Sequence, residues 1–300
     1  MNYLITGGTG FIGKELVKKL TSQLHHVYIL TRTPSIYFNS EFVTYLSFNE
    51  INNLPKLDAI INLAGESIFG YWTQKKKQRI LKSRLEITQL LIEYMKKLEQ
   101  RPSVFISSSG ISYYGFSDEE IFTEATTTPG NDFLANVVMD WESIANQAEA
   151  LGVRTVLTRF GLILGSNGGA LPLMSLPSKL FVGGPLGKGE QWTSWIHIDD
   201  VVELLVFAIQ NPKITGVLNV TAPKPIRNKD FNQILANTLN RPYWFPTPSL
   251  LIRVATGEMS QLVLKGQYVL PNKALENGFT FTYPTLESAL EQCFPHVKKF

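Results

Sequence analysis

The chain has 300 residues, of which 44% are hydrophobic and 18% charged, and its formal net charge is +3. These values fit one domain with a smaller lobe, and the scattered basic residues do not form the patch of a nucleic-acid-binding protein. The single cysteine cannot form an intrachain disulfide, and no apolar stretch reaches the roughly 18 to 20 residues that span a bilayer. The N-terminus also lacks a signal-peptide pattern, so we expect a cytoplasmic protein with no nucleic-acid or membrane partner.

Short apolar runs alternate with helical patterns through the first half of the chain. Strands are predicted at residues 3–6, 27–30, 59–63, 104–107 and 153–159, with helices at 11–22, 73–99 and 133–150. A stretch rich in glycine and proline follows, before a helix and a strand return between residues 194 and 222. Such alternation is typical of a doubly wound α/β fold, in which helices cover both faces of a parallel sheet.

A glycine-rich turn joins the first predicted strand to the first predicted helix. It reads "ITGGTGFIG" and holds Gly7, Gly10 and Gly13 around Phe11 and Ile12. Glycines in this position permit a tight turn, let the backbone approach a pyrophosphate and allow close helix–strand packing, while amides at the helix start face the phosphates. The turn therefore predicts a Rossmann-type dinucleotide site, with a merely flexible turn as the alternative.

The boundaries of the two parts follow from this assignment. We expect a dinucleotide-binding Rossmann domain at residues 1–165, completed by about 196–222. A smaller, partly interleaved C-terminal lobe is predicted from residues 166–195 and 223–300. In open α/β sheets a ligand lies in the crevice beyond the carboxyl ends of the strands. The substrate is therefore expected between the sheet and this lobe.

The end of the second predicted strand indicates which dinucleotide binds. An NAD enzyme normally offers Asp or Glu to the ribose hydroxyls about 20 residues beyond the glycines. This chain has Thr31 and Arg32 there instead. A guanidinium pairs with a 2′-phosphate, so the cofactor is predicted to be NADP(H). The alternative for Arg32 is an ordinary solvated loop cation.

Three segments resemble the NAD-dependent epimerase/dehydratase superfamily of extended short-chain dehydrogenases/reductases. They are "ITGGTGFIG", "INLAG" at 61–65 and "SWIHIDDVV" at 194–202. More narrowly, "SSSGISYYG", "RFGLILGSNGGAL" and "EMSQLVLKGQYVLPNKALENGF" resemble an atypical branch described only as epimerase family protein, with a C-terminal domain of unknown role. The resemblance covers essentially the whole chain.

The resemblance also implies further cofactor-binding residues. It places Leu63, Ala64 and Gly65 beside the adenine and ribose. It puts Lys82, Ser83 and Arg84 in a patch near the cofactor, where Arg84 would reach a phosphate or a substrate anion. A solvated helix face is the alternative for this patch.

The catalytic residues of the wider family are only partly present. Its members use a serine together with a Y-x-x-x-K pair on one helix, whose ammonium lowers the pKa of the phenol. In the matching helix, Leu134 and Val138 occupy the two positions. The remaining catalytic candidates are Ser109, in the family's serine position, and Tyr113 and Tyr114, in the loop expected over the nicotinamide. Ser109 as a polar strand cap and Tyr114 as a packed loop aromatic are the alternatives.

A histidine and two tryptophans near residue 195 are further candidates. His197 precedes Asp199 and Asp200 but lacks further ligands at metal spacing, so we expect a structural histidine at a helix start and no metal site. Trp192 and Trp195 are predicted to line the substrate cleft or to belong to the core.

These features together predict an NADP(H)-dependent oxidoreductase or epimerase-like enzyme. Its substrate would be a small carbonyl or sugar-type molecule, and the protein would be a monomer or a homodimer. The missing Tyr–Lys pair leaves a second hypothesis open. It is a catalytically silent NADP(H)-binding sensor or regulatory protein whose lobes close on the cofactor.

Overall fold

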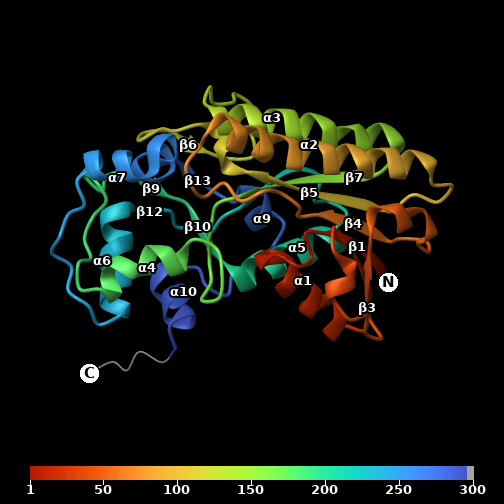
Figure 1. The fold of residues 1–300 in the computed structure, drawn as a ribbon, viewed down its shortest axis with the longest axis horizontal. Coiled ribbons are helices and arrows are strands. Elements are labelled where there is room, and N and C mark those ends of the chain that lie inside the picture. The colour runs from red at the N-terminus through yellow and green to blue at the C-terminus, as the bar shows by residue number, and fades with distance from the viewer. Residues whose placement is uncertain (296–300) are drawn as a thin grey trace.

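The computed structural model describes residues 1–295 and contains a seven-stranded parallel sheet (Figure 1). The strand order is β11-β7-β5-β4-β1-β2-β3. The strands are β1 (Asn2–Thr6), β2 (His26–Leu30), β3 (Val43–Leu46), β4 (Ala59–Asn62), β5 (Val104–Gly110), β7 (Arg154–Phe160) and β11 (Gly216–Val220). The predicted doubly wound Rossmann-type sheet is therefore confirmed. The sequence did not predict β3, an edge strand whose four residues are all only half-buried.

Helices cover both faces of this sheet. Helices α1 (Phe11–Ser22) and α5 (Ile198–Gln210) lie on one face, and α2 (Gln74–Lys97) and α3 (Phe133–Ala145) lie on the other (Figure 1). Successive residues of a strand point to opposite faces. Within β1, Ile5 belongs to the cluster of α1 and α5, whereas Leu4 packs into the cluster of α2 and α3. Burial on both faces explains why these strands are continuous apolar runs.

Outside the seven-stranded sheet and its four covering helices, the second half of the chain contains short strands and helices. They are β8 (Leu162–Leu164), α4 (Leu171–Lys179), β9 (Trp192–Thr193), β10 (Trp195–His197), β12 (Ile226–Arg227), α6 (Asn228–Thr238), α7 (Ser249–Thr256), α8 (Gln261–Leu264), β13 (Tyr268–Val269), α9 (Asn272–Glu276) and α10 (Leu286–Cys293). Strand β8 pairs with β10, and β9 pairs with β12. Helices α6 and α10 form the core of the lobe around Phe231, Leu235 and Leu290.

The last part of the lobe returns to the Rossmann domain. Strand β13 pairs in parallel with β6 (Ile121–Phe122), which lies in the loop that follows β5. The backbone amides of Thr282 and Tyr283 donate to the two carboxylate oxygens of Asp200 in α5, at 2.7 and 3.0 Å. The predicted interleaving thus extends to residues 268–283. The exact division into two domains stays a prediction.

Two features are absent from residues 1–295. No helix of this part is both long enough and apolar enough to cross a membrane. The same residues contain no group of three or more His, Cys, Asp or Glu side chains that could hold a metal ion.

Candidate functional site

The glycine-rich turn brings β1, α1 and β4 into close contact. Gly7 has φ +72°, and a Cβ added to it would lie 2.6 Å from the carbonyl oxygen of Leu63. A Cβ on Gly13 would lie 2.2 Å from the carbonyl oxygen of Gly7. Backbone packing therefore demands glycine at both positions. Gly10 differs, because the nearest atom to an added Cβ is the Gly7 oxygen at 3.2 Å.

A cavity of about 710 Å³ opens next to this turn, at the carboxyl ends of β1, β2 and β4. We call it the sheet-edge cavity. Its wall includes seven of the predicted cofactor-binding residues, namely Gly7, Gly10, Thr31, Arg32, Leu63, Ala64 and Gly65. Gly10 is also the N-cap residue of α1, so the first amides of this helix lie beside the cavity. The space left by the missing Gly10 side chain and the helix N-terminus fit a dinucleotide pyrophosphate.

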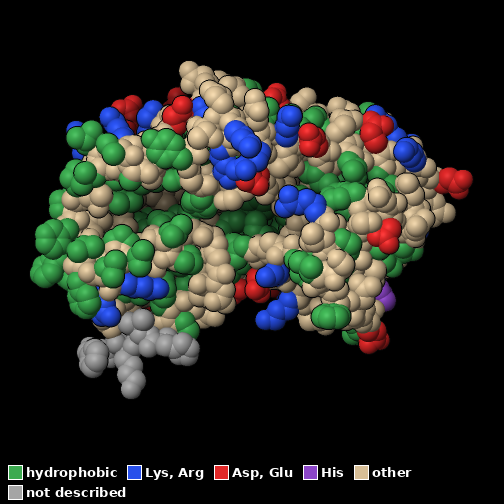
Figure 2. All heavy atoms as spheres, viewed as in Figure 1, with side chains coloured by type: hydrophobic (Ala, Val, Ile, Leu, Met, Phe, Trp, Pro, Cys, Tyr) green, Lys and Arg blue, Asp and Glu red, His purple; other side chains and the backbone are tan. Residues whose placement is uncertain are grey.

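Charged side chains of α2 complete the wall of the sheet-edge cavity. Arg79 and Lys82 join Arg32 there, together with Glu66 and Glu86. The sequence analysis expected Lys82 near the cofactor but did not expect Arg79. Arg79 lies three residues before Lys82, and this spacing places two side chains on the same face of a helix. In Figure 2, Lys and Arg side chains border a hollow in the molecular surface.

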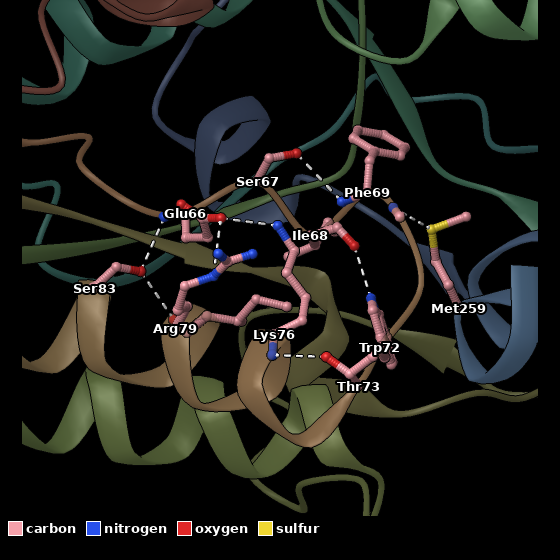
Figure 3. Close-up of polar contacts among 12 residues, drawn as sticks. Glu66, Ser67, Ile68, Phe69, Trp72, Thr73, Lys76, Arg79, Ser83 and Met259 are labelled. Atoms are coloured by element: carbon pink, nitrogen blue, oxygen red, sulfur yellow. Dashed lines mark hydrogen bonds and ion pairs between the residues drawn. The ribbon is translucent and has the colours of Figure 1, made fainter.

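Glu66 is the carboxylate of this wall with the most cationic neighbours. Its Oε1 accepts a hydrogen bond from Lys76 Nζ at 2.9 Å and lies 3.7 Å from Arg79 Nε (Figure 3). The hydrogen bond from Lys76 and nearby cations, Arg32 among them, hold the pKa of Glu66 below its usual range. Its negative charge is therefore offset by Lys76 and by the arginines of the same wall.

Arg84 lies behind the sheet-edge cavity and is not part of its wall. Its Nη1 donates to the carbonyl oxygens of Glu66 at 3.1 Å and Ile80 at 2.9 Å. Its guanidinium fills the space beside Gly65, where an added Cβ would lie 3.2 Å from Cζ. Burial lowers the pKa of Arg84 to about 10. This arginine holds the segment after β4 in place, and direct cofactor contact stays a prediction.

The segment of residues 66–73 leads from the sheet-edge cavity towards the C-terminal lobe (Figure 3). The Glu66 amide donates to Ser83 Oγ at 2.9 Å, which ties the start of the segment to α2. The Gly70 amide donates to Met259 Sδ at 3.2 Å, which ties its end to the lobe. The segment therefore connects the two parts of the molecule.

A second cavity, of about 380 Å³, lies between the sheet and the C-terminal lobe, and we call it the lobe cavity. Its wall combines Ile68 and Phe69 with residues that follow β5 and β7 and with residues 259–267. Phe11, expected at the cofactor, is also part of this wall. Glycines of the loop before α4 surround its ring, and a Cβ on Gly168 would lie 2.4 Å from Phe11 Cδ2.

The remaining predicted residues of the turn and the tryptophans occupy different places. Ile12 packs against the sheet core, and Gly13 is buried at the start of α1. Trp192 lines the lobe cavity. Trp195 is fully buried in the core of the lobe. The core alternative thus applies to Trp195, whereas a place in a substrate cleft stays a prediction for Trp192.

Ser109 lies at the end of β5 in a buried polar network. Its hydroxyl donates to Glu142 Oε1 of α3 at 2.5 Å. The same carboxylate accepts hydrogen bonds from Arg159 Nε at 2.8 Å and Nη2 at 2.7 Å. Ser109 is not part of the wall of either cavity. Its catalytic role stays a prediction.

The two candidate tyrosines also have protein partners. The Tyr113 hydroxyl donates to the carbonyl oxygen of Thr127 at 2.7 Å, and the Tyr114 hydroxyl donates to Asn219 Oδ1 at 2.8 Å. Burial raises the pKa of Tyr114. Neither tyrosine is part of the wall of the sheet-edge cavity or the lobe cavity. A proton-transfer role for either stays a prediction.

Ser112 is a polar residue that sequence reasoning missed. It lies in the same "SSSGISYYG" segment and is part of the wall of the lobe cavity. Within residues 1–295, its hydroxyl forms no hydrogen bond. A hydroxyl on the wall of a mainly apolar cavity can orient a ligand oxygen. Ser112 lies three residues beyond the run of serines at 107–109, and only the turn after β5 brings it to the cavity.

The parallel sheet, the glycine turn and the cavity at its edge define a dinucleotide-binding protein of the Rossmann type. The chain belongs to the NAD dependent epimerase/dehydratase family, whose model matches residues 3–221. Residues 247–293 match a second model, described as a domain of unknown function (DUF1731). The family resemblance inferred from the sequence is thus confirmed.

Relatives and solved structures agree with this assignment. The chain is 46% identical over 296 residues to the epimerase family protein YfhF of Bacillus subtilis, covering 97% of each chain. It is 44% identical over 292 residues to the epimerase family protein SSP1921 of Staphylococcus saprophyticus, covering 97% of this chain and 98% of that one.

Two solved structures are similar to this chain in fold. The human epimerase family protein SDR39U1 (isoform 2), solved with NADPH, has a TM-score of 0.90 and 33% identity over 99% of this chain and 100% of that one. UDP-glucuronic acid 4-epimerase from Bacillus cereus has a TM-score of 0.79 over 99% of each chain, and its 18% identity shows a shared fold only.

Proposed function

We propose that the chain is an NADP(H)-dependent oxidoreductase or epimerase-like enzyme, with NADP(H) in the sheet-edge cavity and a small carbonyl or sugar-type substrate in the lobe cavity. The observation that carries this proposal is the position of Arg32 at the end of β2, beside Arg79 and Lys82 on one wall. Three cations there suit a 2′-phosphate better than bare ribose hydroxyls. The NADPH in the structure of the human relative supports the same choice.

The residues of the sheet-edge cavity bind the cofactor, and the residues of the lobe cavity bind the substrate. The first amides of α1 bind the pyrophosphate, and Arg32 binds the 2′-phosphate. Bound NADP(H) would supply a hydride donor or acceptor. The apolar wall of the lobe cavity excludes water from the substrate, and the Ser112 hydroxyl donates a hydrogen bond to a substrate oxygen.

Cofactor preference tests this proposal directly. We expect NADPH to bind roughly 10- to 150-fold more tightly than NADH, because a hydrogen bond to a charged group contributes about 1.5 to 3 kcal/mol. Arg32→Ala should remove most of this difference, as measured by calorimetric titration. Arg253→Ala, an exposed arginine of α7, is the matched control and should leave it unchanged. Equal affinities of the unmodified protein for both dinucleotides would contradict the proposal.

A second candidate function is a sensor that binds NADP(H) without turnover. Two observations favour it. Leu134 and Val138 are buried where the family's Tyr and Lys would stand, and the hydroxyls of Ser109, Tyr113 and Tyr114 are bound to the protein itself. The sensor hypothesis requires tight NADPH binding with no NADPH oxidation by any carbonyl compound or sugar nucleotide. Turnover of any such compound would exclude it.

A further inference from the structure

The wall of the lobe cavity is mainly apolar. Aromatic and aliphatic side chains reach it from distant parts of the chain, including Phe11, Phe69, Phe116, Met174, Trp192 and Leu262. Figure 2 shows hydrophobic side chains inside the hollow and around its border on the side of the C-terminal lobe. Such a wall stabilises apolar ligand surface and offers few partners to a strongly hydrated ligand.

The lobe cavity has fewer charged residues on its wall than the sheet-edge cavity has. Among the residues of 1–295 that line the lobe cavity, Lys265 alone is charged, and it is exposed, with Nζ 5.5 Å from the centre of the Phe116 ring. Arg227 lies near the cavity, but its guanidinium stacks 3.7 Å from the centre of the Trp192 ring and donates to the Glu190 carbonyl oxygen. A diphosphate placed here would lose hydration without a cluster of cations to replace it.

Most polar groups of the same wall already have protein partners. Ser194 Oγ donates to the Gln267 carbonyl oxygen at 2.8 Å, and the Gln267 amide group donates to the Ile111 carbonyl oxygen at 3.1 Å. Within the part of the chain that the structure describes, the hydroxyls of Ser112 and Thr193 form no hydrogen bond. These groups match a ligand with few polar atoms and not a sugar with many hydroxyls.

We infer that the lobe cavity binds a mainly apolar carbonyl compound and not a nucleoside diphosphate sugar. This inference rests on the proposed function, because it names the substrate class of the same site. The apolar part of the ligand lies against the aromatic wall. Its oxygen accepts a hydrogen bond from Ser112 or Thr193.

Binding to the NADP⁺-loaded protein tests the inference, because the oxidised cofactor cannot reduce a ketone. We expect 4-phenyl-2-butanone to give a saturable calorimetric signal and UDP-glucose to give none under the same conditions. Met174→Lys, which places an ammonium on the cavity wall, should weaken ketone binding by at least roughly tenfold. Leu173→Lys, the exposed neighbour on α4, is the matched control and should have no effect.

A second variant guards against a folding defect in Met174→Lys. Phe69 lines the cavity but is 43% exposed, so Phe69→Lys should fold and should also weaken ketone binding. The inference is overturned if UDP-glucose binds more tightly than the ketone, or if both cavity variants bind the ketone normally. A protein that binds NADP⁺ but no ketone would overturn the substrate class alone. Failure to bind NADP⁺ would overturn the proposed function as well.

Discussion

Gly10 and Gly13 stand three residues apart in one motif, yet an added side chain would meet different surroundings. At Gly13 it would collide with the backbone of Gly7, since the added Cβ would lie 2.2 Å from the carbonyl oxygen. At Gly10 it would point into the sheet-edge cavity, with its nearest protein atom 3.2 Å away. Gly13 therefore serves packing, and Gly10 keeps space for a ligand.

Substitution of the two glycines separates these roles. Gly10→Val should retain the circular dichroism spectrum and thermal stability of the protein but abolish NADPH binding, because its side chain takes the space of the pyrophosphate. Gly13→Val, the matched control, should lower the free energy of unfolding by about 1 to 3 kcal/mol through overpacking. If Gly10→Val unfolds in the same way, the turn serves packing alone.

The sequence predicted the residues of the sheet-edge cavity where a short motif sets their position. Gly7, Gly10 and Arg32 are of this kind, because the end of a strand fixes where its next residues lie. The direction of side chains on α2 was harder to predict from the sequence, since neighbouring helix positions point about 100° apart around the axis. Lys82 therefore faces the cavity while Arg84 faces Gly65 and the Trp141 ring.

At the scale of elements, burial decides what the sequence could predict. The central strands are apolar on both faces, and their positions followed from the sequence with small errors at the ends. The two-residue strands β6 and β13 were missed, because their pairing joins residues 121–122 to residues 268–269. A pairing between such distant short segments leaves no periodic pattern. Such long-range contacts also bring together the segments that line the lobe cavity. The sequence therefore predicted a site between the sheet and the lobe, but it did not predict most of the residues that line it.

His197 is the N-cap residue of helix α5, at the helix start that the sequence predicted. Nδ1 of His197 accepts a hydrogen bond from the Asp199 amide at 3.2 Å, and its ring lies 4.2 Å from the ring of Tyr283. Burial lowers the pKa of His197, although Asp199 and Asp200 oppose this effect. The native state therefore binds fewer protons than the unfolded chain just below the ordinary histidine pKa of about 6.5.

The stability contributed by this cap should depend on pH. It is complete above the unfolded pKa of about 6.5 and is lost as the pH falls through the lower folded pKa. Urea unfolding of the unmodified protein and His197→Asn, compared across this range, should show a flatter profile for the variant. Asparagine still caps the helix, whereas His197→Ala should cost about 1 kcal/mol at neutral pH. Identical pH profiles for the protein and His197→Asn would contradict this role.

At the scale of the whole molecule, the two lobes share structure that is distant in the sequence. Strand β13 pairs with β6, and Lys273 of α9 donates to the carbonyl oxygen of Thr215, just before β11, at 2.7 Å. The chain then leaves the sheet again to form α10, which packs on α6. Because the C-terminal segment contributes to both lobes, we expect them to unfold together.

A substitution far from the sheet tests this cooperativity. Leu290→Ala removes a fully buried side chain between α10 and α6, and should lower the free energy of unfolding by about 2 to 5 kcal/mol. If the molecule unfolds as one unit, amides of β4 at the centre of the sheet should lose hydrogen-exchange protection to the same extent as amides of α6. Leu250→Ala, at a leucine of α7 that is 69% exposed, is the matched control and should change neither. Loss of protection in α6 with β4 unaffected would show instead that the C-terminal lobe unfolds on its own, and that the return of the chain through β13 and α9 does not couple it to the dinucleotide-binding domain.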